Sequence, residues 1–358
     1  NYVDLKDQPV PEGQHLLEVD DLKMYFHTED GVVRAVDGVS YTLDRGETLG
    51  VVGESGSGKS VTAMTIMGLI SMPPGKIEGG DVRYRGRSIL EMTEEEMQHI
   101  RGNDIAMIFQ DPMTSLNPVY KIGKQVGEGL RLHRGYSKQE ALKRATELLD
   151  LVGIPEPEKR VNEYPHQFSG GMRQRVMIAM ALACDPDILI ADEPTTALDV
   201  TIQAQIIELM QEMQEKNGNA IIMITHDLGV VADMADKIMV MYAGRPVEFG
   251  TAEEIFYESR HPYTWGLIRS IPEQAIEEKK PLTPIHGNPP SLMNLPEGCV
   301  FSPRCPYATD KCRKQRPERV VTESGHYSAC HYSGDPEFLK NAPETSRTRK
   351  DSKKGGEA

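Results

Sequence analysis

Short apolar runs alternate with amphipathic segments between about residue 16 and residue 250. The apolar runs are typical of buried strands: TLGVVG (48–53), DIAMIFQ (104–110), DILIADE (187–193), NAIIMITH (219–226) and KIMVMYAG (237–244). Apolar positions at helical spacing predict helices over 61–70, 172–184 and 201–216. This alternation predicts an α/β fold with a mostly parallel core sheet.

The regions outside residues 16–250 lack this alternation of apolar runs and amphipathic segments. Residues 1–15 are polar and contain proline and glycine, which predicts a flexible leader. The stretch 281–296 holds five prolines and predicts a linker or a wrapping arm. The last residues, 336–358, are polar and basic at their end and predict a disordered tail.

Charge and hydropathy limit the classes of function. The net charge of −14 argues against a general DNA- or RNA-binding role, because phosphate contacts need clustered Lys and Arg. No apolar run approaches the roughly 18 residues that indicate a membrane span. The first residues lack the basic and apolar regions of a signal peptide, so we expect a cytoplasmic chain.

The stretch GESGSGKS (53–60) matches the pattern of a phosphate-binding loop and lies between a predicted strand and a predicted helix. Its glycines let backbone N–H groups turn toward a phosphate chain, and the helix N-terminus adds positive potential. Lys59 is expected to reach the β- and γ-phosphates, and the Ser60 hydroxyl to bind Mg²⁺. The predicted nucleotide-binding residues are Gly53, Glu54, Ser55, Gly56, Ser57, Gly58, Lys59, Ser60 and Val61.

A second polar site follows the apolar run ILIA, where the strand ends in Asp192 and Glu193. We expect Asp192 to hold Mg²⁺ directly or through water. Glu193 would then face the γ-phosphate and act as general base on the attacking water.

The stretch FSGGMRQR (168–175) contains a second candidate anion site. Ser169 suits a helix N-cap, and Gly170 and Gly171 allow close approach of an anion to the backbone. By itself the stretch is most typical of an ordinary capped helix. Because one phosphate site is already assigned, the alternative is that this helix end serves the nucleotide of another molecule.

Taken together, these motifs show that residues 16–256 resemble the ATP-binding subunits of ABC transporters. The resemblance rests on GESGSGKS, IFQDPMTSLNP, FSGGMRQR, ILIADEPTTALD and ITHD, in this order. Within FSGGMRQR, the stretch FSGGM differs from the LSGGQ pattern that is commoner in this family by Phe168 and Met172. Its Ser-Gly-Gly core is intact. The resemblance also implies a helical subdomain at about 111–180, where Ser137 and Glu140 form a possible capping box.

The resemblance implies roles for further residues. Gln110 is similar to the residue that senses Mg²⁺ and γ-phosphate, and His226 to the residue that contacts the γ-phosphate. Asp199 is similar to the aspartate at the subunit interface. Phe26 best matches the position that stacks on adenine, with Tyr25 as the alternative.

It also implies partners. Two ATPase subunits would pair head to tail around two ATP molecules, and the second subunit is either another copy or a homologous one. Two transmembrane permease subunits and, indirectly, an extracellular peptide-binding protein complete the assembly. The chain would then be peripheral, on the cytoplasmic face of the cell membrane, and would not bind nucleic acid.

Four cysteines gather near the end of the chain: Cys299, Cys305, Cys312 and Cys330. Their spacing does not match the paired hooks of a zinc ribbon. Four thiolates suit tetrahedral Zn²⁺ or an iron–sulfur cluster, and a reducing compartment makes disulfides the weaker alternative. His326 and His331 are substitute ligands if the metal is zinc.

The C-terminal region, 257–335, resembles the extension of oligopeptide and dipeptide importer ATPases. The resemblance rests on HPYTWGLIRSIP, IHGNPPSL and GCVFSPRCPYATDKC. It implies a [4Fe–4S] cluster on the four cysteines and ATP hydrolysis that powers peptide import. The extended tail and SGGMRQR favour the first of two paired ATPase subunits. An importer of nickel or another small solute, and a non-transport ABC ATPase, are the alternatives.

Overall fold

In the computed structural model, residues 4–109, 111–195, 200–272 and 283–344 are described. The core is a sheet with the strand order β11-β12-β10-β9-β3-β8-β7-β6. All of the predicted apolar runs lie in it as parallel neighbours: β3 (Thr48–Val52), β6 (Ile105–Ile108), β7 (Ile188–Asp192), β8 (Ala220–Thr225) and β9 (Lys237–Tyr242). The predicted α/β fold with a mostly parallel core sheet is therefore confirmed.

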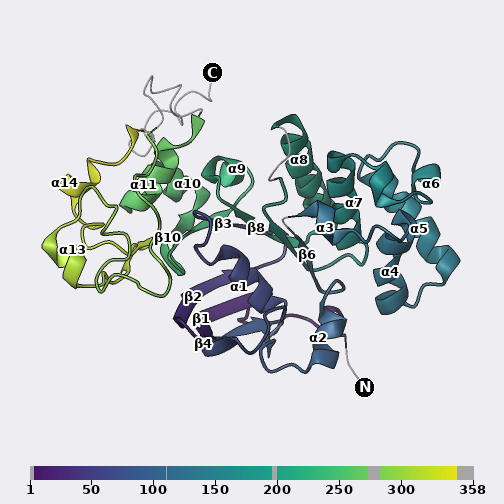
Figure 1. Cartoon of the computed structure of the whole chain (residues 1–358), viewed down its shortest axis with the longest axis horizontal. Coiled ribbons are helices and arrows are strands. Elements are labelled where there is room, and N and C mark those ends of the chain that lie inside the picture. The colour runs from purple at the N-terminus through teal and green to yellow at the C-terminus, as the bar shows by residue number, and fades with distance from the viewer. Residues whose placement is uncertain (1–3, 110, 196–199, 273–282, 345–358) are drawn as a thin grey trace.

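A second, antiparallel sheet has the order β2-β1-β4-β5. Its strands are β1 (Leu17–Thr28), β2 (Gly31–Leu43), β4 (Gly75–Tyr84) and β5 (Arg87–Ser88). Leu17, Val19, Leu22 and Met24 bury their side chains in the same cluster as Ala63 and Ile66 of helix α1 (Lys59–Ile66). This sheet therefore covers the helix that follows the phosphate loop (Figure 1).

Helices α3 (Pro112–Ser115), α4 (Ile122–Arg134), α5 (Lys138–Leu151), α6 (Pro157–Arg160) and α7 (Gly170–Leu182) form a separate group at the right of Figure 1. Ser137 and Glu140 form the predicted capping box at the start of α5. Helix α2 (Glu94–Ile100) lies below this group, beside the antiparallel sheet. The remaining helices of the ATPase region are α8 (Val200–Asn217), α9 (Leu228–Ala232) and α10 (Ala252–Tyr257).

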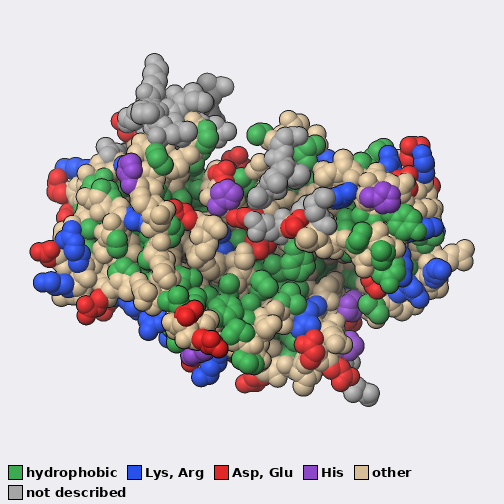
Figure 2. Space-filling model, viewed as in Figure 1, with side chains coloured by type: hydrophobic (Ala, Val, Ile, Leu, Met, Phe, Trp, Pro, Cys, Tyr) green, Lys and Arg blue, Asp and Glu red, His purple; other side chains and the backbone are tan. Residues whose placement is uncertain are grey.

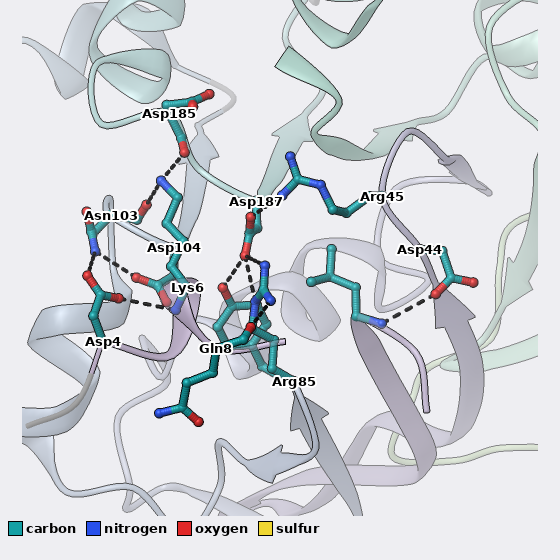
Figure 3. A network of polar contacts seen from close by, with 12 residues as sticks. Asp4, Lys6, Gln8, Asp44, Arg45, Arg85, Asn103, Asp104, Asp185 and Asp187 are labelled. Carbon is teal, nitrogen blue, oxygen red and sulfur yellow. Dashed lines mark hydrogen bonds and ion pairs between the residues drawn. The ribbon is translucent and has the colours of Figure 1, made fainter. Parts of the chain in front are cut away.

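The predicted flexible leader includes an ordered 3-10 helix, Leu5–Asp7. Leu5 is buried, and Lys6 Nζ donates to the carbonyl oxygens of Cys184 at 2.8 Å and Asn103 at 3.3 Å. Figure 3 shows this network, which continues to Asp104 and Asp187. One apolar and one cationic side chain therefore hold the segment against the core.

The C-terminal extension is attached to the core sheet through β10 (Arg245–Thr251), which pairs with β12 (Tyr327–Ser328). β12 also pairs with β11 (Val320–Val321), and α11 (Pro262–Arg269) and α13 (Asp310–Lys314) complete this part. Trp265 is fully buried and packs against Tyr307 and Phe338.

The start of the predicted disordered tail is also ordered. Phe338 belongs to α14 (Pro336–Leu339), and Ala342 is buried. An aromatic contact with Trp265 therefore extends the packed region beyond the predicted boundary at 335. Residues 345–358 lie outside the described residues.

Candidate functional site

The stretch 53–60 joins β3 to α1, as the motif requires. Gly58 caps α1 in the left-handed region, with φ of 95°. A Cβ at this position would lie 2.1 Å from the carbonyl oxygen of Ala35, which no side chain can tolerate. Gly58 therefore lets the loop pass tightly against β2 before the helix begins.

The Lys59 side chain bridges two carbonyl groups of the phosphate-binding loop. Its side chain is buried, and Nζ donates to the carbonyl oxygens of Gly53 at 2.6 Å and Glu54 at 2.8 Å. Burial lowers the pKa of Lys59, and the negative charges of Glu193 and Asp192 oppose that shift. The ammonium group is therefore available inside a loop that can exchange its carbonyl contacts for phosphate oxygens.

Asp192 lies at the end of β7, beside the first turn of α1. Burial raises the pKa of its carboxyl group, although the Ser60 hydroxyl donates a hydrogen bond to it. Its Oδ1 is buried without a hydrogen-bond partner among the described residues. Adjacent hydroxyl and carboxylate oxygens are the ligands that Mg²⁺ prefers, so Ser60 and Asp192 fit this ion.

Glu193 follows with φ of 44°, in the left-handed region that is rare for a residue with a side chain. Its Oε1 lies 3.2 Å from Nδ1 of His226, which follows β8. It also lines a cavity of about 120 Å³ together with Ser55, Gly56, Gly58, Lys59, Ser60 and Val61. The strand ends therefore bring a carboxylate and an imidazole to the phosphate loop.

The structure separates the Ser-Gly-Gly stretch from this cavity. Ser169 caps α7 by accepting a hydrogen bond from the backbone N–H of Met172 at 3.2 Å, as the sequence predicts. Ser169 and Gly170 are exposed, and neither lines the cavity around Lys59. Gln110 and Asp199 lie outside the described residues.

Tyr25 and Phe26 point in different directions, as neighbours on a strand do. The Tyr25 hydroxyl donates to Oδ1 of Asp37 at 2.7 Å, so this side chain takes part in the polar contacts around Asp37. Phe26 is half-buried and packs against the apolar cluster that contains Ala63 of α1. Tyr25 is therefore held by Asp37, whereas Phe26 lies against the apolar cluster over α1.

Two residues of the C-terminal extension contact the phosphate loop, and neither contact is predicted from the sequence. Arg304 pairs with the carboxylate of Glu54, and the backbone N–H of Glu54 donates to the hydroxyl of Tyr263 at 2.9 Å. No local pattern marks these residues, because 250 residues separate Arg304 from Glu54.

Two observations bear on the metal site that the sequence predicts at the four clustered cysteines. Among the described residues, no group of three or more His, Cys, Asp or Glu side chains is arranged to hold a metal ion. The predicted metal site is therefore not confirmed. Even so, Cys299, Cys305, Cys312 and Cys330 all line one small cavity. Burial raises the pKa of Cys305 to about 11 and of Cys330 to about 12, and the negative charge of neighbouring cysteines adds to both shifts.

Helices α4 and α5 border a large groove of about 1020 Å³. Apolar side chains exposed along it are Val119, Tyr120, Leu132, Tyr136 and Leu142. Figure 2 shows hydrophobic side chains gathered over this helical group, at the right of the view. In the described part of the chain, no helix is long and apolar enough to cross a membrane.

Comparison with known proteins adds to this geometry. A family model described as "ABC transporter" matches residues 36–196, and one described as "Oligopeptide/dipeptide transporter, C-terminal region" matches residues 247–312. The chain is 58% identical over 312 residues to the oligopeptide transport ATP-binding protein OppD of Bacillus subtilis, covering 87% of each chain. It is 52% identical over 320 residues to the dipeptide transport ATP-binding protein DppD of Escherichia coli, covering 89% of this chain and 97% of that one.

Among solved structures, the fold is similar to a dimeric post-hydrolysis state of the ATP-binding cassette MJ0796 bound to ADP and Pi. The TM-score is 0.59 at 29% identity, over 66% of this chain and 98% of that one. The cassette structure cbiO1 of Clostridium perfringens gives the same TM-score over 68% of this chain and 92% of that one.

Proposed function

The chain belongs to the family of ATP-binding subunits of oligopeptide and dipeptide ABC transporters, and on this premise we propose that it hydrolyses ATP to power peptide import through a membrane transporter. The observation that carries the proposal is the cavity in which Glu193 meets Lys59 and Ser60. The two family matches, one over the ATPase core and one over the extension, support the peptide class.

In the proposed reaction, the loop 53–60 holds the triphosphate, with Lys59 exchanging its carbonyl contacts for β- and γ-phosphate oxygens. Mg²⁺ would be held by Ser60 and Asp192, with Gln110 as a further ligand, and would neutralise phosphate charge. Glu193 orients a water molecule and accepts its proton as the water attacks the γ-phosphorus. The bond from the γ-phosphorus to the β–γ bridging oxygen breaks, and ADP and inorganic phosphate are released. His226, 3.2 Å from Glu193, would steady that carboxylate and contact the γ-phosphate.

A complete site requires a second ATPase subunit. Ser169 and Gly170 are exposed at the N-terminus of α7 and do not line the Lys59 cavity, so they are free to contact a nucleotide on another subunit. Asp199 would lie at the same interface, and Phe26 would stack on adenine. The dimeric form of the cassette MJ0796 supports pairing, and we infer that the partner is a homologous ATPase subunit.

The groove between α4 and α5 is proposed as the contact with the two permease subunits. Exposed apolar side chains such as Val119 and Leu132 suit a short amphipathic helix from a membrane protein. The chain would then act as a peripheral protein on the cytoplasmic face of the membrane. A peptide-binding protein would act on the other side, without contacting this chain.

The four cysteines are proposed to hold a [4Fe–4S] cluster. Each thiolate of such a cluster binds a different iron atom, so the ligands stand farther apart than around a single ion. The four cysteines line one cavity, so their thiols converge on one place, which a shared cluster requires. The cluster would cross-link segments of the extension that are distant in sequence and add to its stability.

Reconstitution with its permeases in vesicles would test the proposal. We expect ATP-dependent uptake of labelled di- and oligopeptides, no uptake with Glu193→Gln, and co-purification with the permeases. Uptake of nickel without peptides would favour the small-solute alternative. A nucleic-acid-bound complex without membrane subunits would exclude transport.

A further inference from the structure

A cleft of about 530 Å³ is lined by residues of β1, β2, the start of β10 and the C-terminal extension. We call it the arginine cleft, because its cationic lining consists of Lys23, Arg34, Arg245, Arg316 and Arg319. Two carboxylates, Asp21 and Asp37, oppose them, so three positive charges are unbalanced. This concentration stands out in a chain with a net charge of −14.

The floor of the arginine cleft contains a buried cation with an unused donor. Arg245 is 9% exposed, and its Nε donates to Oδ2 of Asp37 at 2.8 Å. Its Nη2 lies 2.7 Å from the same oxygen but makes no hydrogen bond among the described residues. The other oxygen of Asp37 accepts from Tyr25. Asp37 therefore holds Arg245 at the cleft by an ion pair, and an acceptor in the cleft would complete the hydrogen bonding of Nη2.

The rim adds three arginines that make no ion pair among the described residues. In the described part of the chain, Arg34, Arg316 and Arg319 form no ion pair, whereas Lys23 pairs with Asp21 at 3.2 Å. Burial and the positive charges of Arg245 and Arg34 lower the pKa of Arg316. The positive charges of the guanidinium groups therefore repel one another across the cleft. A bound anion would be attracted by each of them and would offset this repulsion.

Neither the nucleotide nor the cysteine thiolates account for these cations. The arginine cleft shares no lining residue with the cavity around Lys59, so it is not part of the phosphate loop's site. Cys299 lines both the cleft and the cysteine cavity, so its thiolate could balance some of the positive charge. The cation that acts on the Cys299 thiol is Arg245, on the floor of the cleft.

We propose that the arginine cleft binds a small anion with two or more negative charges, of the phosphate or phosphate-ester class, between the ATPase core and the extension. Guanidinium groups match phosphate oxygens in planar, paired hydrogen bonds. The volume is that of a small-molecule site. The anion would join Arg34 and Arg245 of the core to Arg316 and Arg319 of the extension.

The position of the arginine cleft connects its occupancy to the phosphate loop. The carbonyl oxygen of Ala35, next to Arg34, borders Gly58 of the loop, and the carbonyl oxygen of Arg34 borders Gly244, next to Arg245. An anion that draws Arg34 and Arg245 together therefore acts on the backbone against which the loop packs.

Calorimetric titration of the full chain with inorganic pyrophosphate tests the proposal. The background is Lys59→Ala, because the phosphate loop could also take up the probe. We expect one binding site, weakened by added salt, and binding weaker by roughly tenfold or more in Arg34→Gln/Arg316→Gln. Both substituted residues are exposed, so the fold should persist, and thermal unfolding without pyrophosphate checks this.

The matched control is Arg144→Gln, which removes an exposed arginine on α5 and should leave the affinity unchanged. Equal affinity with and without the rim substitutions overturns the proposal. So does the absence of binding at millimolar pyrophosphate.

Discussion

Arg304 of the cysteine-rich extension forms a two-pronged ion pair with Glu54 inside the phosphate-binding loop. Nη1 lies 2.7 Å from Oε2 and Nη2 2.9 Å from Oε1. The arginine is itself held by the carbonyl oxygens of His286 at 2.9 Å and Gly287 at 3.0 Å. Arg304 immediately precedes Cys305. A shift of the backbone at Cys305 would therefore move Arg304 and, through the ion pair, Glu54 of the loop that binds ATP.

Replacing Arg304 should therefore impair nucleotide binding more than chemistry. Arg304→Lys keeps the charge but loses the paired geometry, and Arg304→Gln loses both. We expect the KM for ATP to rise by roughly three- to tenfold in Arg304→Lys and more in Arg304→Gln, with a smaller change in kcat. Steady-state ATPase assays measure both constants.

A double-mutant cycle with Glu54→Gln separates this effect from general destabilisation. If the pair positions the loop, the second substitution adds little once the first is present. Fully additive effects, or a fall in kcat with unchanged KM, would contradict the positioning role. Arg313→Gln, which removes an exposed partner of Asp310, is a control from the same region.

Glu193→Gln should preserve ATP binding and stop turnover. The amide has nearly the shape of the carboxylate and cannot accept the proton of the attacking water, so we expect a loss of roughly 10²–10⁴-fold in kcat. Filter binding or calorimetry with ATP measures the retained affinity. Hydrolysis at the unmodified rate would remove Glu193 as the base. Glu147→Gln, an exposed carboxylate on α5, should leave hydrolysis unchanged.

The features that could be predicted from sequence are those that leave a local pattern. The parallel strands are continuous apolar runs because both faces are buried, as in β7 and β8. The phosphate loop has a fixed spacing because its backbone wraps a phosphate chain. The antiparallel sheet was missed because its half-buried strands include polar residues, such as Asp20 and Asp21 in β1.

Contacts between distant segments leave no local pattern. Lys6 binds the carbonyl oxygen of Cys184, 178 residues away, and nothing near Lys6 marks this contact. The same holds for Arg304 and Glu54. The closeness of Glu193 and His226 was expected from the family resemblance, since two strand ends meet only once the order of the sheet is known.

Asp104 should make stability depend on pH (Figure 3). Burial raises the pKa of its carboxyl group to about 7, and the negative charge of Asp4 adds to the rise. The folded state thus holds a proton that the unfolded state, with an ordinary Asp pKa near 3.9, releases. This stabilisation is present at low pH and is lost as pH rises from about 4 to about 7.

Asp104→Asn cannot ionise and should gain stability relative to the unmodified chain across that range. We expect a difference on the order of 4 kcal/mol in the free energy of unfolding by pH 8, measured by urea titration at several pH values. Asp185→Asn, an exposed aspartate of the same region, is the control. Parallel pH profiles for Asp104→Asn and the unmodified chain would contradict the prediction.

The chain contains its own control for the cysteine cluster. Cys184 is buried near the end of α7, away from the cavity that the other four cysteines line.

Protein purified without oxygen should contain iron and acid-labile sulfide in equal amounts and absorb broadly near 400 nm. Cys312→Ser should lower the iron content and the thermal stability of the extension, because a ligand and the cross-link are lost together. Cys184→Ser should retain the full iron content. Full iron content in Cys312→Ser, or tightly bound zinc in colourless protein, would exclude a [4Fe–4S] cluster on these four residues.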